Sequence, residues 1–200
     1  MAAFETLPGE TPIDDISGLK VRSITTRAAL NKVEAENIRK AIVKYLSRKP
    51  SRRAARFDLA WLLQLHREMF GDVWTWAGSL RVSVTNLGVA PEKIEVQLKN
   101  LLDDFAYWVE HGIDLMQQAV MLHHRAVQVH PFPNGNGRWA RLLTNIWLKM
   151  NNKPPIEWPE ATIGTVSVIR NEYIDAIKAA DAGDYDPMLS LHKRFTPDRT

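Results

Sequence analysis

Two stretches in the second half of the chain have the most regular pattern of hydrophobic positions. In the first, apolar residues recur at steps of three and four, at Leu115, Ala119, Leu122, Ala126 and Val129. In the second they recur at Trp139, Leu142, Leu143, Ile146, Trp147 and Met150. Because this spacing places the apolar side chains on one face of an α-helix, both stretches are predicted to be buried amphipathic helices.

The same periodicity predicts four other helices, over residues 31–46, 58–70, 91–110 and 161–180. The first begins at a cap supplied by Thr26 or Asn31. Its expected inner face consists of Ile38, Ile42, Tyr45 and Leu46. In the second helix His66 falls on the apolar face, where a hydrogen-bonded core histidine is expected rather than a ligand. The last helix carries Arg170 and Tyr173 within its apolar stripe, which also includes Ile169, Ile174 and Ile177.

One short stretch favours β-structure. Val82 and Val84 alternate with Ser83 and Thr85, and residues 86–88 supply a turn, so a hairpin is predicted. It is too small to be a stable sheet alone. The fold class is therefore mostly α with one hairpin. Residues 1–24 lack a sustained period and are expected to form an extended arm. Residues 48–56 are expected to be a solvated basic loop, with a partner-binding patch as the alternative.

The two central helices are joined by residues 130–141, HPFPNGNGRWAR. Pro131 and Pro133 end the first helix, and Gly135 and Gly137 allow a tight turn before the second one. The first N–H groups of a helix lack intrahelical partners, and the helix dipole places partial positive charge there. This arrangement of glycine loop and helix start is therefore predicted to bind an anion.

Three side chains around this loop suggest what the anion is. Arg138 and Arg141 lie three residues apart on the first helical turn, and their forked donors suit phosphate. His130 stands at the mouth of the loop and is suited to act as a general base near neutral pH, with a structural histidine as the alternative. The predicted ligand is a polyphosphate, and the predicted chemistry is transfer of part of it.

Composition sets bounds on this hypothesis. The chain has 200 residues, 45% hydrophobic and 24% charged, as in an ordinary soluble domain with a real core. A net charge of +3 is too small to argue for a nucleic-acid partner. The absence of cysteine excludes disulfides and thiolate metal sites. There is no secretory signal and no run of about 20 apolar residues, so no membrane partner is expected and a cytoplasmic location is predicted by default.

The segment 130–141 resembles the motif H-x-F-x-[DN]-G-N-G-R-x-x-R of the Fic family, with every specified position filled. The wider chain resembles the short bacterial Fic proteins named mobile mystery protein B. That similarity extends over Leu30-Asn31, Glu34, Asn37-Ile38 and Trp76-Ala77-Gly78. The resemblance implies a Fic-type helical bundle in one compact domain, with an arm and candidate inhibitory helix over residues 1–50 and a catalytic core over residues 51–200.

The resemblance also implies roles for the motif residues. His130 would take the proton from a Ser, Thr or Tyr hydroxyl that attacks the α-phosphorus of ATP. Asn134 matches the Mg²⁺-coordinating position, where Asp is commoner, so weaker metal binding is expected. The remaining roles concern the nucleotide: Gly135, Asn136 and Gly137 would cradle the α- and β-phosphates, Arg138 would hold the β-phosphate, Arg141 the γ-phosphate, and Arg170 and Tyr173 would wall the adenine pocket. Phe132 is expected to anchor the loop in the core.

Two regulatory and docking elements follow from the same resemblance. The hairpin over Val82, Ser83, Val84 and Thr85 would be the flap that holds the target segment as an added strand. Many Fic proteins are silenced by a glutamate that pairs with the second motif arginine, here Arg141. The candidates are Glu34 and Glu36. Glu34 is preferred because it lies four residues before Ile38 and so on the buried face of the helix, whereas Glu36 falls roughly opposite. The alternative is two solvated carboxylates at a helix start.

The leading hypothesis is thus a protein adenylyltransferase, autoinhibited by an N-terminal glutamate. One alternative is a Fic-type transferase of another phosphate-containing group, and another is a nucleotide-binding module without turnover. The implied partners are a target protein with a reactive hydroxyl and an antitoxin-like protein, since the resemblance suggests the toxin half of a mobile bacterial toxin–antitoxin-like pair.

Overall fold

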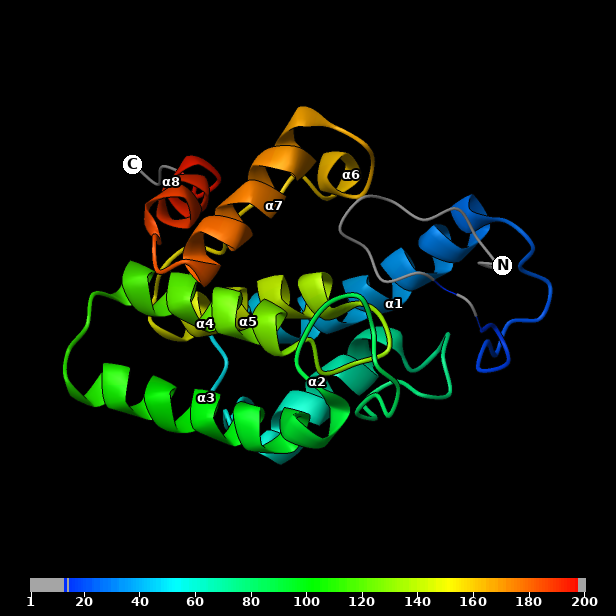
Figure 1. Cartoon of the computed structure of the whole chain (residues 1–200), viewed down its shortest axis with the longest axis horizontal. Helices are drawn as coiled ribbons and strands as arrows, with labels where there is room; N and C mark the ends of the chain where they lie inside the picture. The colour runs from blue at the N-terminus through cyan, green and yellow to red at the C-terminus, as the bar shows by residue number, and fades with distance from the viewer. Residues whose placement is uncertain (1–12, 14, 198–200) are drawn as a thin grey trace.

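The computed structural model describes residue 13 and residues 15–197. Its centre is the pair formed by α4 (Leu115–Val129) and α5 (Asn136–Met150), the two helices on either side of the 130–135 loop. They pack against each other along their length, as Figure 1 shows. Both helices predicted from the strongest periodicity are confirmed, and their apolar faces are buried between the two outer layers.

The outer layers lie on opposite sides of this pair (Figure 1). On one side are α2 (Leu59–Phe70) and α3 (Ile94–Glu110), the latter preceded by the 3₁₀ turn η1 (Pro91–Lys93). On the other side are α6 (Glu160–Ile163), α7 (Val168–Asp181) and α8 (Asp186–Arg194). Each layer closes its own hydrophobic cluster against the central pair, and Phe132 of the motif loop belongs to the cluster that includes α2 and α3.

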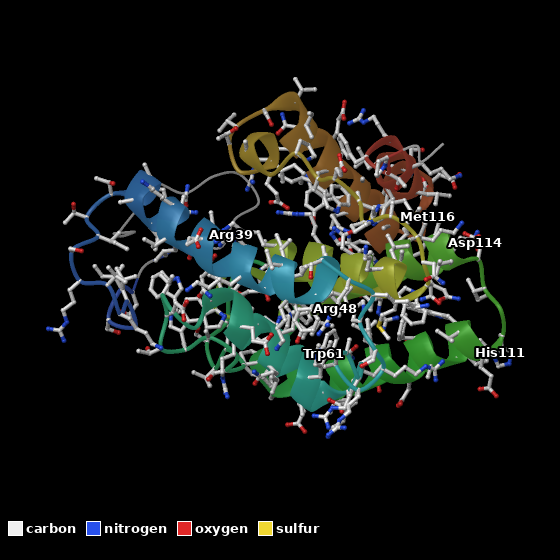
Figure 2. All side chains as sticks on the ribbon, turned by 180° about the vertical axis from the view of Figure 1, so that it is seen from behind. Arg39, Arg48, Trp61, His111, Asp114 and Met116 are labelled. Atoms are coloured by element: carbon white, nitrogen blue, oxygen red, sulfur yellow. The ribbon has the colours of Figure 1, made fainter. Side chains whose placement is uncertain are left out.

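Helix α1 (Arg27–Leu46) packs against both α2 and α5. Thr26 caps it, because its hydroxyl accepts a hydrogen bond from the N–H of Ala29 at 3.2 Å. Seen from behind in Figure 2, α1 runs beside α2, and Trp61 lies at their contact. There the indole N–H of Trp61 donates to the hydroxyl of Tyr45 at 3.3 Å.

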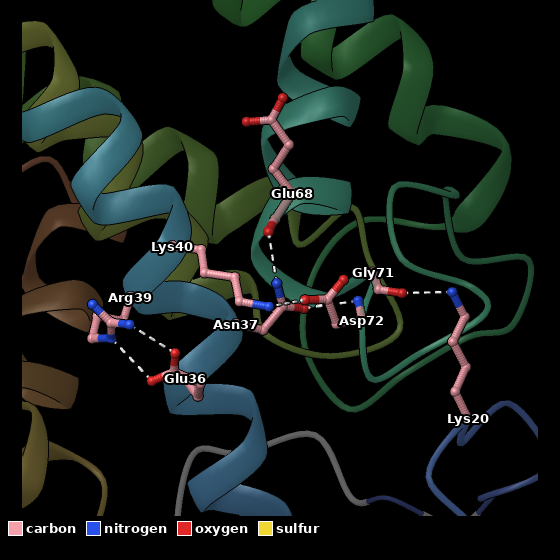
Figure 3. Close-up of polar contacts among 8 residues, drawn as sticks. All are labelled: Lys20, Glu36, Asn37, Arg39, Lys40, Glu68, Gly71 and Asp72. Atoms are coloured by element: carbon pink, nitrogen blue, oxygen red, sulfur yellow. Dashed lines mark hydrogen bonds and ion pairs between the residues drawn. The ribbon is translucent and has the colours of Figure 1, made fainter.

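The inner face predicted for α1 is partly wrong. Tyr45 is buried as expected, but Ile38 and Leu46 are only half-buried and Ile42 is 41% exposed. The residues that are buried instead include polar ones, among them Asn37. Its amide donates to the carbonyl of Glu68 and accepts from the N–H of Asp72, at 3.0 and 2.9 Å (Figure 3). These polar contacts with the end of α2 rotate α1 about its axis, so that it buries a different face from the one that periodicity alone predicts.

The predicted β-hairpin is absent: residues 81–89 contain no strand, nor does any other part of the chain that the structure describes. Val82 and Val84 project into solvent, 93% and 82% exposed. Their alternation with Ser83 and Thr85 suits a strand, but no neighbouring strand supplies the hydrogen bonds that a ladder needs. The segment is an exposed loop with both ends fixed on the motif.

The long helix predicted over residues 161–180 is also wrong in one respect, because it is divided into α6 and α7. Gly164 follows the single turn of α6, and Ser167 then starts α7 by accepting a hydrogen bond from the N–H of Arg170 at 3.1 Å. A serine N-cap supplies a start signal that the apolar stripe does not contain. The break places α6 over the motif and α7 beside it.

The predicted N-terminal arm falls largely outside the described residues, which omit 1–12 and 14. Leu19 and Ile24 are buried in the same hydrophobic cluster as α2 and the start of α5. A single antiparallel bridge joins Leu19 to Trp74. None of the described helices is both long and apolar enough to cross a lipid bilayer.

Buried histidines make the stability of the fold depend on pH, three of them outside the motif segment 130–141. Burial lowers the pKa of His66 to about 3 and that of His192 to about 4, and it also lowers the pKa of His123. Because the unfolded chain takes up these protons near pH 6.5 and the folded chain does not, the stability present above pH 6.5 is lost as the pH falls. Each histidine contributes up to about 1.4 kcal/mol per pH unit.

We therefore expect the free energy of unfolding, measured by urea denaturation, to fall steeply between pH 7 and pH 5.5. His192→Gln should reduce the slope by one proton, whereas His111→Gln, at an exposed position, should leave it unchanged. A free energy that is constant over this range would contradict the assignment of neutral buried histidines.

Candidate functional site

The loop between α4 and α5 is closed by one asparagine. Asn136, the first residue of α5, accepts a hydrogen bond from the N–H of Phe132 at 2.9 Å and donates to the carbonyl of Phe132 at 2.8 Å. Two left-handed residues shape the turn, His130 at φ 51° and Gly135 at φ 81°. The side-chain amide of Asn136 is therefore occupied in fixing the loop, at both its oxygen and its nitrogen.

The loop rests on an aromatic platform. Phe132 is fully buried, as predicted, and the ring of His66 stacks on it with centroids 3.7 Å apart. His66 accepts a hydrogen bond from the N–H of Gly78 at Nδ1, so its Nε2 carries the proton and donates to the carbonyl of Asn134 at 3.1 Å. The prediction of a hydrogen-bonded core histidine is confirmed, and this histidine carries the loop.

The two motif glycines differ in their surroundings, and only Gly135 is in a place that excludes a side chain. A Cβ at Gly135 would lie 2.5 Å from the ring of Phe70, and the positive φ would strain any L side chain there. At Gly137 a Cβ would meet nothing closer than Arg141 Nη1, at 3.4 Å, on the open side of the loop. No side chain caps the start of α5 in the described structure, so its first N–H groups face the site.

A pocket of about 680 Å³ opens over this helix start. His130, Asn134, Gly135, Asn136, Gly137, Arg138 and Arg141 all line it, together with Arg170 and Tyr173. The structure thus brings together every residue expected to bind a nucleotide. Val82, Ser83, Val84 and Thr85 lie outside the lining. One side of α1 adds an apolar wall through Ala35, Ile38 and Ile42, which explains why Ile42 is not in the core.

His130 is held in its neutral form. The residue is only 7% exposed, and burial lowers the pKa of its imidazole to about 4. The positive charge of Arg81 also lowers this pKa, whereas a hydrogen bond to the backbone of Val127 raises it. At neutral pH the ring is unprotonated, which is the form that a general base needs.

The first motif arginine is paired with a buried carboxylate from α1. Arg138 Nη1 lies 2.7 Å from Glu34 Oε2, and the other oxygen of Glu34 accepts from the indole N–H of Trp74, also at 2.7 Å. Glu34 is 2% exposed, so its predicted place on the buried face is confirmed. Its expected partner was Arg141, and that prediction is wrong, because Glu34 pairs with Arg138, the first motif arginine.

The second motif arginine has a different partner. Arg141 forms a two-point ion pair with Glu160 of α6, with contacts of 2.7 and 2.6 Å. Burial alone would lower the pKa of Arg141, but the charge and hydrogen bonds of Glu160 outweigh burial and raise it. Both cations of the motif are thus neutralised by carboxylates from elements that flank it on opposite sides.

A chain of hydrogen bonds supports Tyr173 beside Arg141. His192 bonds the carbonyl of Met188 through Nδ1 at 2.7 Å, so this nitrogen carries the proton and Nε2 accepts from Nδ1 of His123 at 3.2 Å. His123 Nε2 then accepts from the Tyr173 hydroxyl at 2.9 Å. The neutral tautomers of both histidines follow from one carbonyl, because a carbonyl can only accept.

Glu36, the other inhibitory candidate, lies outside the site. Its carboxylate forms a two-point contact with Arg39 on the exposed side of α1, at 2.8 and 2.9 Å (Figure 3). Neither residue lines the pocket. The predicted placement of Glu36 roughly opposite Glu34 is confirmed.

Two residues of the site were not predicted. Glu160 stands 19 residues from Arg141 in the sequence, and nothing in its surroundings marks it as a partner. Arg81 is buried and donates three hydrogen bonds at the base of the 82–88 loop. Arginine is an unusual core residue. The sequence marks Arg81 only by its position just before the expected strand.

Removing the amide of Asn136 should destabilise the fold. Asn136→Ala leaves the N–H and the carbonyl of Phe132 buried without partners, at a cost of about 1–3 kcal/mol for each group. We therefore expect a loss of about 2–6 kcal/mol in the free energy of unfolding, measured by urea denaturation. Asn151→Ala, which removes an amide from an exposed position, should change it by less than about 0.5 kcal/mol. Equal stability of the two variants would refute the closing role.

The geometry can be compared with known proteins. Residues 56–148 match the family model described as the Fic/DOC family. The chain is 33% identical over 133 residues to protein adenylyltransferase fic-1 of Caenorhabditis elegans, covering 64% of this chain and 25% of the relative. It is 31% identical over 144 residues to protein adenylyltransferase Fic of Drosophila virilis, covering 70% of this chain and 27% of the relative. The chain thus spans about a quarter of the length of these relatives.

Solved structures give the same result for the fold. A structure of C. elegans Fic-1, residues 134–508, superposes with a TM-score of 0.69 at 25% identity, covering 96% of this chain and 51% of that one. The BepC protein of Bartonella tribocorum, solved with AMPPNP, has a TM-score of 0.69 at 19% identity, covering 92% and 94% of the two chains.

Proposed function

Given that this chain belongs to the Fic/DOC family through residues 56–148, we propose that it is a protein adenylyltransferase that moves AMP from ATP to a hydroxyl of a target protein. The proposal rests on one observation: a neutral histidine, a helix start without a side-chain cap and two arginines line the same pocket of about 680 Å³. The names of the relatives support the same reaction.

The reaction has a simple balance at this site. The oxygen of the target hydroxyl forms a bond to the α-phosphorus of ATP, and the bond from that phosphorus to the bridging oxygen breaks. Pyrophosphate leaves, AMP stays on the target, and the hydroxyl proton passes to the ring of His130. Because positioning and charge stabilisation dominate such transfers, the N–H groups of Gly137 and its neighbours matter as much as the base.

Nucleotide binding requires that both arginines become available. Arg138 would hold the β-phosphate and Arg141 the γ-phosphate, but each forms an ion pair at 2.6–2.7 Å. We propose that this arrangement is an autoinhibited state in which Glu34 occupies Arg138 and Glu160 occupies Arg141, the candidate partner of the γ-phosphate. Glu36 has no part in it, because its carboxylate bonds Arg39 on the outer side of α1.

The adenine and the metal are assigned by fit. Arg170 and Tyr173 line one side of the pocket and Ile38 and Ile42 the other, which suits a flat base. Asn134 is the candidate ligand for Mg²⁺, although its Oδ1 already accepts from the N–H of Gly135 at 2.7 Å. A neutral amide oxygen is a weak ligand, so the ion would depend mainly on phosphate oxygens.

The exposed loop over Val82, Ser83, Val84 and Thr85 is the candidate docking site for the target. Its apolar side chains are exposed and its backbone has no strand partner in the described structure. An extended target segment can pair with such a backbone by strand addition. The antitoxin-like partner and the cytoplasmic location remain predictions from the sequence.

Radioactive labelling tests the reaction. We expect α-³²P-ATP with Mg²⁺ to label the protein itself or a lysate protein, and γ-³²P-ATP to leave both unlabelled. His130→Ala should lower the labelling rate by about 10²–10⁴-fold. His111→Ala provides a matched control at an exposed histidine. Label from γ-³²P-ATP would instead indicate transfer of another phosphate-containing group, and ATP binding without any transfer would indicate a binding module.

Substitution of Glu34 and Glu160 tests the proposed autoinhibition. Glu34→Gln keeps an acceptor for Trp74 but removes the negative charge that pairs with Arg138, so labelling should rise by about tenfold, the equivalent of about 1.4 kcal/mol. Glu160→Gln should lower the ATP concentration at half-saturation, and the double variant should show both changes.

Glu36→Gln is the matched control, with the same substitution on the same helix at an exposed ion pair. If it raised labelling as much as Glu34→Gln does, the increase would reflect the loss of a charge on α1 and not the release of Arg138.

A further inference from the structure

The loop that carries Val82 and Val84 is fastened to the motif by one buried arginine. Arg81 is 3% exposed, and its guanidinium donates to three backbone carbonyls. Nε donates to the carbonyl of His130 at 2.7 Å and Nη1 to that of Ser83 at 3.0 Å, while Nη2 donates to that of Val89. One side chain thus joins the start of the loop, its end and the residue expected to act as the base.

The backbone makes parallel connections. The N–H of Arg81 donates to the carbonyl of Pro131 at 2.9 Å, and the N–H of Val89 donates to that of Val129 at 3.4 Å. The loop therefore closes on three consecutive carbonyls, those of residues 129, 130 and 131, where the chain leaves α4 and enters the motif.

His130 needs such support because of its conformation. Its φ of 51° and ψ of 59° are left-handed, a region that strains a residue with a Cβ and persists only when surrounding contacts hold it. Gly88 presses against the residue from the loop, where a Cβ would lie 2.4 Å from the Cβ of His130. Contact with the loop and the bond from Arg81 thus act on the same residue.

We propose that Arg81 is the positioning residue of this site, which couples the 82–88 loop to His130 so that target docking and base placement occur as one unit. The inference deepens the proposed function, since it rests on His130 as the base and on the loop as the docking element. Arg81 contacts both, but it is not among the residues that line the nucleotide pocket. It acts through His130.

The role requires a guanidinium. Three acceptors in different directions match its planar fork, whereas a lysine ammonium is a single point at the end of a flexible stem. Arg81→Lys would therefore keep the charge and lose the simultaneous contacts. Arg81→Ala would leave a space that a small guanidinium compound can occupy and a small amine cannot fill with the same bonds.

The experiment measures self-labelling by α-³²P-ATP in the full chain as a function of ATP concentration. For Arg81→Lys and Arg81→Ala we expect the maximum rate to fall about a hundredfold, the cost of a misplacement of about 1 Å. The ATP concentration at half-saturation should stay within about twofold, because the pocket lining is intact. Ethylguanidine at millimolar concentration should restore part of the rate of Arg81→Ala, and ethylamine should not. Arg125→Lys and Arg125→Ala, at an arginine paired with Asp104 of α3, are the matched controls.

Amide hydrogen exchange provides a readout that does not need catalysis. We expect faster exchange at residues 82–89 and at His130 in both Arg81 variants, and unchanged exchange in α3 and α8. If the wild type transfers no AMP but the exchange changes as described, the proposed reaction fails and the coupling stands. Any one of three results would overturn the inference. The Arg125 variants could lose as much rate as the Arg81 variants, or the Arg81 variants could need more ATP for half-saturation without a lower maximum rate. The third is unchanged amide exchange in the 82–88 loop.

Discussion

The site depends on the pair of hydrogen bonds between the amide of Asn136 and the backbone of Phe132. They fold the chain back on itself within five residues, so that α4 ends at a left-handed residue and α5 starts with free N–H groups. The motif residues that line the pocket are placed by this closure. His66 stacks on Phe132 beneath this loop. Because both rings are packed in the core, the stacking holds the loop in a fixed position.

Around that loop the charges are arranged in opposed pairs. Glu34 comes from α1, 104 residues away from Arg138, and Glu160 comes from α6 on the far side of the central helices. The same guanidinium groups that suit phosphate also suit carboxylate, because both anions offer two oxygens to a planar fork. Competition between the two kinds of anion is thus inherent in a motif that uses arginine, and the surrounding fold decides which one is bound.

Much of this could be predicted from the sequence because it is local. Periodicity identified α4 and α5, and the motif placed His130, Arg138 and Arg141 together. The face argument placed Glu34 inside α1 and Glu36 outside. What failed depends on partners distant in the chain. The alternation from Val82 to Thr85 suits a strand, but strand formation needs a neighbour that the alternation cannot reveal. The choice of Arg138 over Arg141 as the partner of Glu34 depends on how α1 lies across α5, and that is set by contacts such as Asn37 with Asp72.

The contact between Glu34 and Trp74 has an optical consequence. The carboxylate that neutralises Arg138 also accepts the indole N–H of Trp74, whose ring stacks on Trp76 with centroids 4.9 Å apart. Any event that withdraws Glu34 from the motif therefore changes the polarity around one of the seven indoles of the chain. The protein thus carries its own fluorophore in direct contact with Glu34, so that emission spectroscopy can follow the separation of Glu34 from Arg138 without an attached dye.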